Sequence, residues 1–127
     1  MGAMTDYTEE KFLKHFLGAT ALTMPTTVYL AMHTADPTES GASSEATGGS
    51  YARQACAMTW NSGSVRAENT SNVIFPAMPA GTFSHWSLKD AASGGNSLFY
   101  GAVTTPATLS AGDYLRVLAG TLRITAD

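Results

Sequence analysis

The histidines are the side chains of this sequence that could serve catalysis or metal binding, and they stand at His15, His33 and His85. A metal site would need two of them to converge with carboxylates, and no H-x-H or H-x-x-x-H spacing brings two together. His33 and Asp36 could form a triad with a distant serine. Hydroxyl residues are so frequent here that this coincidence carries little weight, and no G-x-S-x-G elbow is present. We therefore expect neither a metal site nor an enzyme.

The other reactive groups also favour structural roles. Cys56 is the single cysteine, so it cannot form an internal disulfide, and its apolar neighbourhood indicates a small buried residue. The glycine-rich stretches at 48–50 and 93–96 neither precede a helix nor carry the lysine of a phosphate-binding loop. They are typical of turns, and we expect no cofactor.

Charge is scarce in this sequence. The net charge is −3, which argues against nucleic acid as a partner, because nucleic-acid binding needs clustered cations. No apolar run approaches the roughly 20 residues that span a membrane, and the N-terminal residues lack a secretory signal pattern, so we expect no membrane partner and no export by that route. Only 13% of residues are charged, where about 25% is usual. This favours a chain that hides part of its surface against other chains, such as a homo-oligomer; a monomer with an uncharged polar surface is the alternative.

Residues 6–17 are predicted to form the helix of this protein. Asp6 can cap its start with Glu9 three residues on, and Gly18 is placed for a left-handed stop. Three turns with one apolar face are not stable alone in water, so the helix should dock on its own sheet or on a neighbour. The apolar face consists of Phe12, Leu13, Phe16 and Leu17.

After Pro25 the hydrophobic period changes from 3.6 to 2, as in "TTVYLAMH" at 26–33. Short alternating segments follow at roughly ten-residue spacing, which predicts a mainly β fold. We expect an antiparallel β-sandwich or barrel of seven to eight strands, in a single domain of residues 1–127 with an N-terminal helical arm at 1–25. The predicted strands lie at 28–33, 51–60, 65–68, 73–75, 82–90, 97–103, 114–118 and 121–126.

A long loop at 34–50 follows the first predicted strand. Loops of that length are uncommon inside a domain and usually bind something or are disordered. Asp36 and Pro37 should turn the chain sharply, although they also fit an ordinary exposed turn. Tyr51 and Arg53 re-enter the sheet as an aromatic and arginine pair, which is typical of an interface anchor or of a plain surface strand. The candidate interface residues are Phe12, Phe16, Asp36, Pro37, Tyr51 and Arg53.

Three stretches of the sequence resemble those of a known protein family. The turn "HTADP" at 33–37, the re-entry "GGSYARQ" at 48–54 and the strand "LFYGA" at 98–102 resemble small virion proteins of tailed bacteriophages, commonly labelled tail-fibre-like proteins. The similar pattern runs from about Tyr7 to Thr125. This resemblance implies a virion component that is made in the host cytoplasm.

The size of the chain bears on its place in the virion. A fibre usually needs length and repeats, and 127 residues without a repeat supply only a knob. A capsid-decoration protein needs a small β-domain with an arm or loop, so we predict a cement protein that bridges major capsid subunits on the head. The alternatives are a tail-tip module that binds a host receptor or glycan through Trp60, Trp86 or Tyr100, and a head–tail or tail-tube component.

Overall fold

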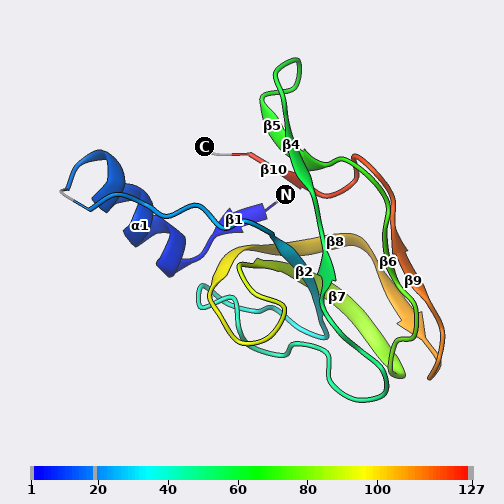
Figure 1. Ribbon diagram of the computed structural model, residues 1–127. Helices are drawn as coiled ribbons and strands as arrows, with labels where there is room; N and C mark the ends of the chain where they lie inside the picture. The colour runs from blue at the N-terminus through cyan, green and yellow to red at the C-terminus, as the bar shows by residue number, and fades with distance from the viewer. Residues whose placement is uncertain (1, 19, 126–127) are drawn as a thin grey trace.

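The computed structural model describes residues 2–18 and 20–125, and strands dominate this part of the chain (Figure 1). The prediction of a mainly β fold with one N-terminal helix is confirmed. The elements are β1 (Gly2–Met4), α1 (Asp6–Phe16), β2 (Tyr29–His33), β3 (Gln54–Ala55), β4 (Met58–Asn61), β5 (Arg66–Asn69), β6 (Val73–Phe75), β7 (Gly81–Lys89), β8 (Ser97–Leu109), β9 (Leu115–Val117) and β10 (Arg123–Ile124).

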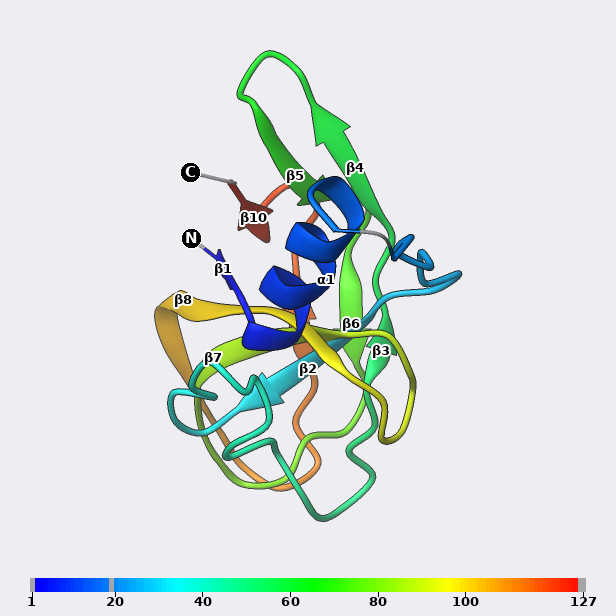
Figure 2. The same cartoon turned by 90° about the vertical axis from the view of Figure 1, so that its left-hand side faces the viewer.

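Eight of these strands form one sheet that curls into a half-barrel, in the order β3-β2-β7-β8-β1-β10-β5-β4. The remaining two, β6 and β9, pair as a small second sheet. All pairs are antiparallel except β1 with β10, so the predicted antiparallel arrangement becomes a mixed one. The β4–β5 hairpin extends away from the rest of the sheet, and α1 lies on a different side from β6 and β9 (Figures 1 and 2).

β1 is not among the strands predicted from the sequence, and its presence makes the long loop follow the second strand rather than the first. Gly2 pairs with Gly101 of β8, and Gly101 pairs with Trp86 of β7. A side chain at Gly2 would collide with the Trp86 ring, so glycine is required for this close approach. Three residues with so little side chain carry no alternating pattern, which is why sequence reasoning did not find the strand.

The helix lies close to the predicted range 6–17, but both predicted capping residues are wrong. Thr5, not Asp6, is the N-cap: its hydroxyl accepts a hydrogen bond from the Thr8 N–H at 3.4 Å. The same hydroxyl donates to the Ser97 carbonyl at 2.5 Å, which fastens the start of α1 to β8. Gly18 has no left-handed backbone conformation, and the helix ends at a C-cap on Leu17.

Most strand boundaries differ from the predicted ones by one or two residues, and two differ more. The segment predicted at 51–60 splits into β3 and β4, and β8 continues well beyond 103. The pairing of β7 with β8 jumps from His85–Ala102 to Phe83–Ala107, so residues 103–106 form a bulge. Pro106 lies within this bulge, where its missing N–H removes no bond of the ladder.

The core lies between the curled sheet and the β6–β9 pair. β2 is buried on both faces, because Leu30 and Met32 face the core and the loop that follows covers His33. Tyr51 stacks on Phe75 with ring centroids 6.0 Å apart. The largest buried core side chains include Phe75, Met78, Phe83, Trp86 and Leu88.

Candidate functional site

The loop at 34–50 is fastened to the sheet of its own chain. The His33 ring bridges the two: Nδ1–H donates to the Ser43 carbonyl at 2.7 Å, and Nε2 accepts from the Ser87 hydroxyl at 2.8 Å. Backbone hydrogen bonds from Thr34 to Ser44 and from Ala46 to Met32 hold the two ends of the loop. The loop is therefore held in place by its own chain, and no partner protein is needed to order it.

Asp36 and Pro37 make the sharp turn that the sequence predicts. The Asp36 carboxylate accepts a hydrogen bond from the Thr38 N–H at 2.8 Å, as in an Asx turn. Pro37 is buried, whereas Asp36 is exposed. The turn is confirmed, and the interface role of these two residues stays a prediction.

Arg53 and Tyr51 are engaged within the chain through Glu45. The Arg53 guanidinium binds both carboxylate oxygens of Glu45, at 2.7 and 2.9 Å, and donates to the carbonyls of Ala91 and Gly94. Burial alone would raise the pKa of Glu45, but the hydrogen bonds and charge of Arg53 outweigh burial and hold that pKa below its usual value. Tyr51 donates its hydroxyl hydrogen bond to the same carboxylate at 3.1 Å. These contacts leave only 11% of the Arg53 side chain exposed. The interface role of Tyr51 and Arg53 stays a prediction.

A buried lysine supplies another attachment of the loop. The Lys89 ammonium donates to the Gly41 carbonyl at 2.7 Å and to the Ser97 hydroxyl at 2.5 Å. Burial lowers the pKa of Lys89, which the nearby Glu45 charge opposes. Gly41 has a φ of 64°, and a side chain there would collide with Ser97 and Thr5, so this position requires glycine.

The structure does bring a serine and a histidine together, but in an inaccessible place. Ser87 and His33 are both fully buried, and the group that orients His33 is the Ser43 carbonyl rather than Asp36. A substrate cannot reach this pair. Burial raises the pKa of the Cys56 thiol to about 11, which keeps it protonated and unreactive at neutral pH.

Within residues 2–18 and 20–125, no group of three or more His, Cys, Asp or Glu side chains is arranged to hold a metal ion. Nor does that part of the chain contain a helix of the length and hydropathy needed to cross a membrane.

The apolar side of α1 is the most exposed hydrophobic feature of the described chain. Phe12 is 46% exposed and Phe16 66%, and their rings contact each other at a centroid distance of 4.7 Å. No residue of α1 is buried. With Leu13 and Leu17, also exposed, the two phenylalanines form one surface, here called the α1 face: Phe12, Leu13, Phe16 and Leu17.

The chain holds α1 in place mainly at its start. Thr5 bonds to β8, and the Asp6 N–H donates to the Glu39 carbonyl of the loop at 3.0 Å. Beyond the helix, His15 Nδ1 accepts from the Leu22 N–H at 3.0 Å and folds the following segment back toward α1. A helix of eleven residues takes most of its stability from packed apolar surface, which the α1 face does not receive from its own chain.

The protein is a small β-domain with a projecting helix, an exposed apolar face and loops that are hydrogen-bonded to their own chain. These are features of a structural module of a larger assembly. The family described as "Podophage GP4 fiber I protein gp80" matches residues 3–125, which is nearly the whole sequence. The chain belongs to this family. A search of curated proteins finds no relative.

Membership of this family confirms the resemblance to small virion proteins of the tail-fibre-like kind. The chain is thus a phage structural protein, and its family fits a location in the virion. Of the predicted interface residues, the structure places Phe12 and Phe16 together on the α1 face, and places Asp36, Pro37, Tyr51 and Arg53 in or beside the loop.

Proposed function

We propose that this chain is a subunit of a virion fibre that associates with a second copy of itself through the α1 face. The observation that carries this proposal is the exposure of four large apolar side chains on one side of a helix anchored at its start. The family description, which names a fibre protein, supports the fibre over the head shell. The proposal therefore departs from the capsid location expected from size alone.

The charges of α1 favour a second copy as the partner. Its first turn carries Asp6 and Glu9, and its last turn carries Lys14 and His15. In an antiparallel pair related by a two-fold axis, the acidic start of one helix lies beside the basic end of the other. Such a pair would bury both α1 faces and complement their charges at once.

The expected strength follows from the exposed phenylalanines. Full burial of a phenylalanine contributes about 1.5–3 kcal/mol, so covering the roughly half-exposed Phe12 and Phe16 contributes about 1 kcal/mol each. Two copies bring four such rings, for a total of about 4 kcal/mol, or about three orders of magnitude in the dissociation constant. The two phenylalanines should therefore decide whether the dimer exists at micromolar concentration.

Analytical ultracentrifugation of the purified chain tests the proposal. We expect a dimer for the natural chain, a folded monomer with a cooperative melting curve at a somewhat lower temperature for the double variant Phe12→Ser/Phe16→Ser, and a dimer for Trp60→Ser. Trp60 is the matched control, because it is 63% exposed on the separate β4–β5 hairpin. A natural chain that stays monomeric at tens of micromolar would refute the α1 interface.

Capsid decoration is the second candidate, favoured by the projecting α1 and the small size of the domain. Gold-labelled antibody on intact virions separates the two candidates, since label on fibres supports the proposal and label over the head shell supports decoration. Binding of the purified chain to heads stripped of it, through the major capsid protein, would independently favour decoration.

A further inference from the structure

One edge of the large sheet is open. The sheet ends in β3 on one side and in β4 on the other. β3 has only two residues and lies against β6. Among the described elements β4 lies against β5 alone, and its hairpin extends away from the rest of the sheet (Figure 1). The outer edge of β4 is therefore the place where a further strand can join the sheet.

The outward backbone groups of β4 belong to Met58 and Trp60. In an antiparallel ladder, the backbone N–H and C=O groups of successive residues point to alternate sides of the strand. The Ala57 carbonyl accepts a hydrogen bond from the Thr70 N–H at 3.0 Å, which fixes the side that faces β5. The N–H and C=O groups of Met58 and Trp60 therefore point to the open edge, where the described part of the chain offers them no hydrogen-bond partner.

β4 lacks the features that usually protect an edge strand. Natural edges carry lysine, proline or a bulge, which prevents pairing with another chain. Residues 57–65 contain no charged residue and no proline, and the register between β4 and β5 runs without a shift. Trp60 is 63% exposed although it lies within the strand. These features indicate an edge that is covered in an assembly.

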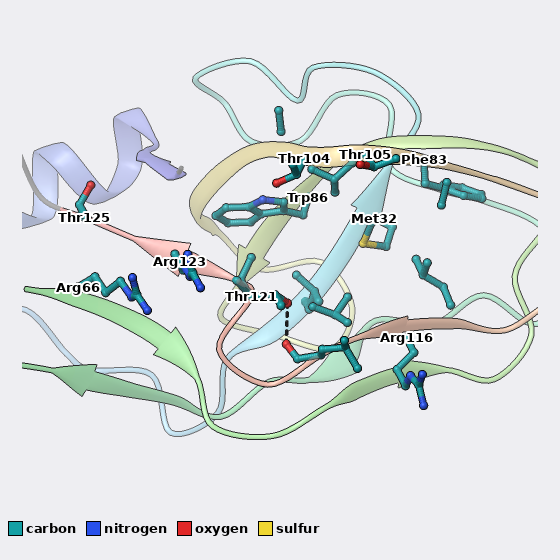
Figure 3. Close-up of a pocket in the computed structure, with 18 of the residues that line it drawn as sticks. Met32, Arg66, Phe83, Trp86, Thr104, Thr105, Arg116, Thr121, Arg123 and Thr125 are labelled. Carbon is teal, nitrogen blue, oxygen red and sulfur yellow. Dashed lines mark hydrogen bonds between the residues drawn. The ribbon is translucent and has the colours of Figure 1, made fainter. Parts of the chain in front are cut away.

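The charges nearest to this edge do not oppose a second copy. Glu68 lies opposite Thr59 on β5 and is paired with Arg66 at 2.7 Å. Arg66 lines one end of the cavity inside the curled sheet, near Arg123 of the neighbouring β10 (Figure 3). Two copies can therefore bring their β4 edges together without placing unpaired like charges opposite each other.

We propose that β4 pairs with β4 of a second copy, antiparallel and related to it by a two-fold axis at Thr59. In this register Met58 lies opposite Trp60 of the second copy, and each such pair exchanges two backbone hydrogen bonds, so every outward group of these residues is satisfied. The exposed Trp60 ring gains the Met58 side chain of the second copy as a neighbour on the same face of the sheet. The two Thr59 side chains meet on the other face.

This pairing explains how a short chain builds a fibre, and the linear assembly rests on the proposed α1 dimer. α1 and β4 do not contact each other in the described chain, so both surfaces can be occupied at once. Copies with two different two-fold interfaces connect alternately through α1 and β4, and they form an open line unless the two axes meet. The length of the fibre then comes from repetition of a 127-residue subunit.

Cross-linking through a cysteine at the two-fold axis detects this contact. Thr59→Cys places two thiols in a non-hydrogen-bonded pair, where a Cα separation of about 4.5 Å suits a disulfide. In the Phe12→Ser/Phe16→Ser background, mild oxidation with copper phenanthroline should link Thr59→Cys chains in pairs about tenfold faster, or more, than Thr104→Cys chains. Thr104→Cys is the matched control, because Thr104 is an exposed threonine of β8. Cys56 is buried, so it does not compete.

The pairing should be weaker than the α1 dimer, because two short strands bury little apolar surface. We expect it at about 1 mM rather than at tens of micromolar, so Trp60→Ser remains a dimer in the test of the α1 face. At the higher concentration, small-angle X-ray scattering of the natural chain should show particles larger than a dimer. Thr59→Lys places like charges opposite each other at the axis and should return these particles to a dimer, whereas Thr104→Lys should not.

Equal cross-linking rates for Thr59→Cys and Thr104→Cys, in variants that thermal melts show to be folded, would overturn the β4 pairing. Rapid cross-linking at Thr59 in a chain whose natural form stays monomeric at tens of micromolar would support the β4 pairing and refute the α1 interface. With the α1 face intact, oxidised Thr59→Cys chains should form rods in negative-stain electron microscopy. Compact four-chain particles in place of rods would overturn the linear assembly, because the two axes would then meet.

Discussion

The replacement Arg53→Met tests whether this arginine belongs to the chain's own structure. Its guanidinium makes four hydrogen bonds, two to the Glu45 carboxylate and two to the carbonyls of Ala91 and Gly94. The side chains of Arg53 and Glu45 are only 11% and 20% exposed. Methionine keeps most of the apolar stem and removes every one of these bonds.

The expected cost follows from the carboxylate left behind. Removing one partner of a buried ion pair costs about 3–5 kcal/mol, and the lower end applies here because Glu45 keeps some solvent and the Tyr51 hydroxyl. We therefore expect Arg53→Met to lower the free energy of unfolding by about 3 kcal/mol. For a domain of this size that corresponds to a melting temperature lower by roughly 10 °C.

Urea unfolding and thermal circular dichroism provide the measurement, with an unchanged m-value showing that the loss is one of stability. The double variant Glu45→Gln/Arg53→Met should lose less than the sum of its single variants, because the unpaired carboxylate is gone. Lys14→Met is the control: it breaks the exposed pair with Glu10 and should leave the melting curve unchanged. If Arg53→Met melts with the natural chain yet fails to assemble, then Arg53 is an interface anchor and the internal assignment is refuted.

Three further predictions concern the loop and the core. Burial lowers the pKa of His33 below 6.5, so the unfolded chain takes up a proton at a higher pH than the folded chain does. The free energy of unfolding should therefore be full above pH 6.5 and fall as the pH drops below it. In urea titrations between pH 7 and 5, His33→Gln should lack this dependence on pH. Gly41→Ala should cost about 1–3 kcal/mol in the same assay, because φ is 64° and the added carbon meets Ser97, and an unchanged midpoint would contradict this. Because burial raises the pKa of the Cys56 thiol to about 11, a thiol reagent at pH 8 should react with it only in urea, and rapid reaction of the folded chain would show that the site is open.

Most of the fold prediction came from the hydrophobic pattern of neighbouring residues. The alternation in β2 and β7 and the apolar spacing in α1 are properties of neighbouring residues, and the structure has these elements where the sequence indicates them. β1 depends instead on non-local pairing with β8 and β10, and the N-cap depends on the bond between Thr5 and β8. Thr5 and Asp6 are both good capping types, so only the three-dimensional arrangement could decide between them.

The same distinction between local and non-local contacts applies to the candidate sites. The α1 face is visible in the sequence, because Phe12 and Phe16 are four residues apart on a helix. The sequence also singles out Arg53, but not its acceptors on Ala91 and Gly94, which lie about forty residues away in a turn. Arg66 and Arg123 are likewise 57 positions apart in the sequence, and only the pairing of β5 with β10 brings their strands together.

The scarcity of charge can now be related to where the cations lie. Arg53 and Lys89 are used inside the chain, and Lys11 and Lys14 lie on α1. The other three cations lie on strands: Arg66 on β5, Arg116 on β9 and Arg123 on β10. In the proposed antiparallel dimer, the basic end of each α1 lies beside the acidic start of its partner. Of the remaining arginines, Arg66 is paired with Glu68 at 2.7 Å, whereas neither Arg116 nor Arg123 forms an ion pair with a described carboxylate. Five of the seven lysine and arginine side chains are therefore engaged by groups of their own chain or lie on α1.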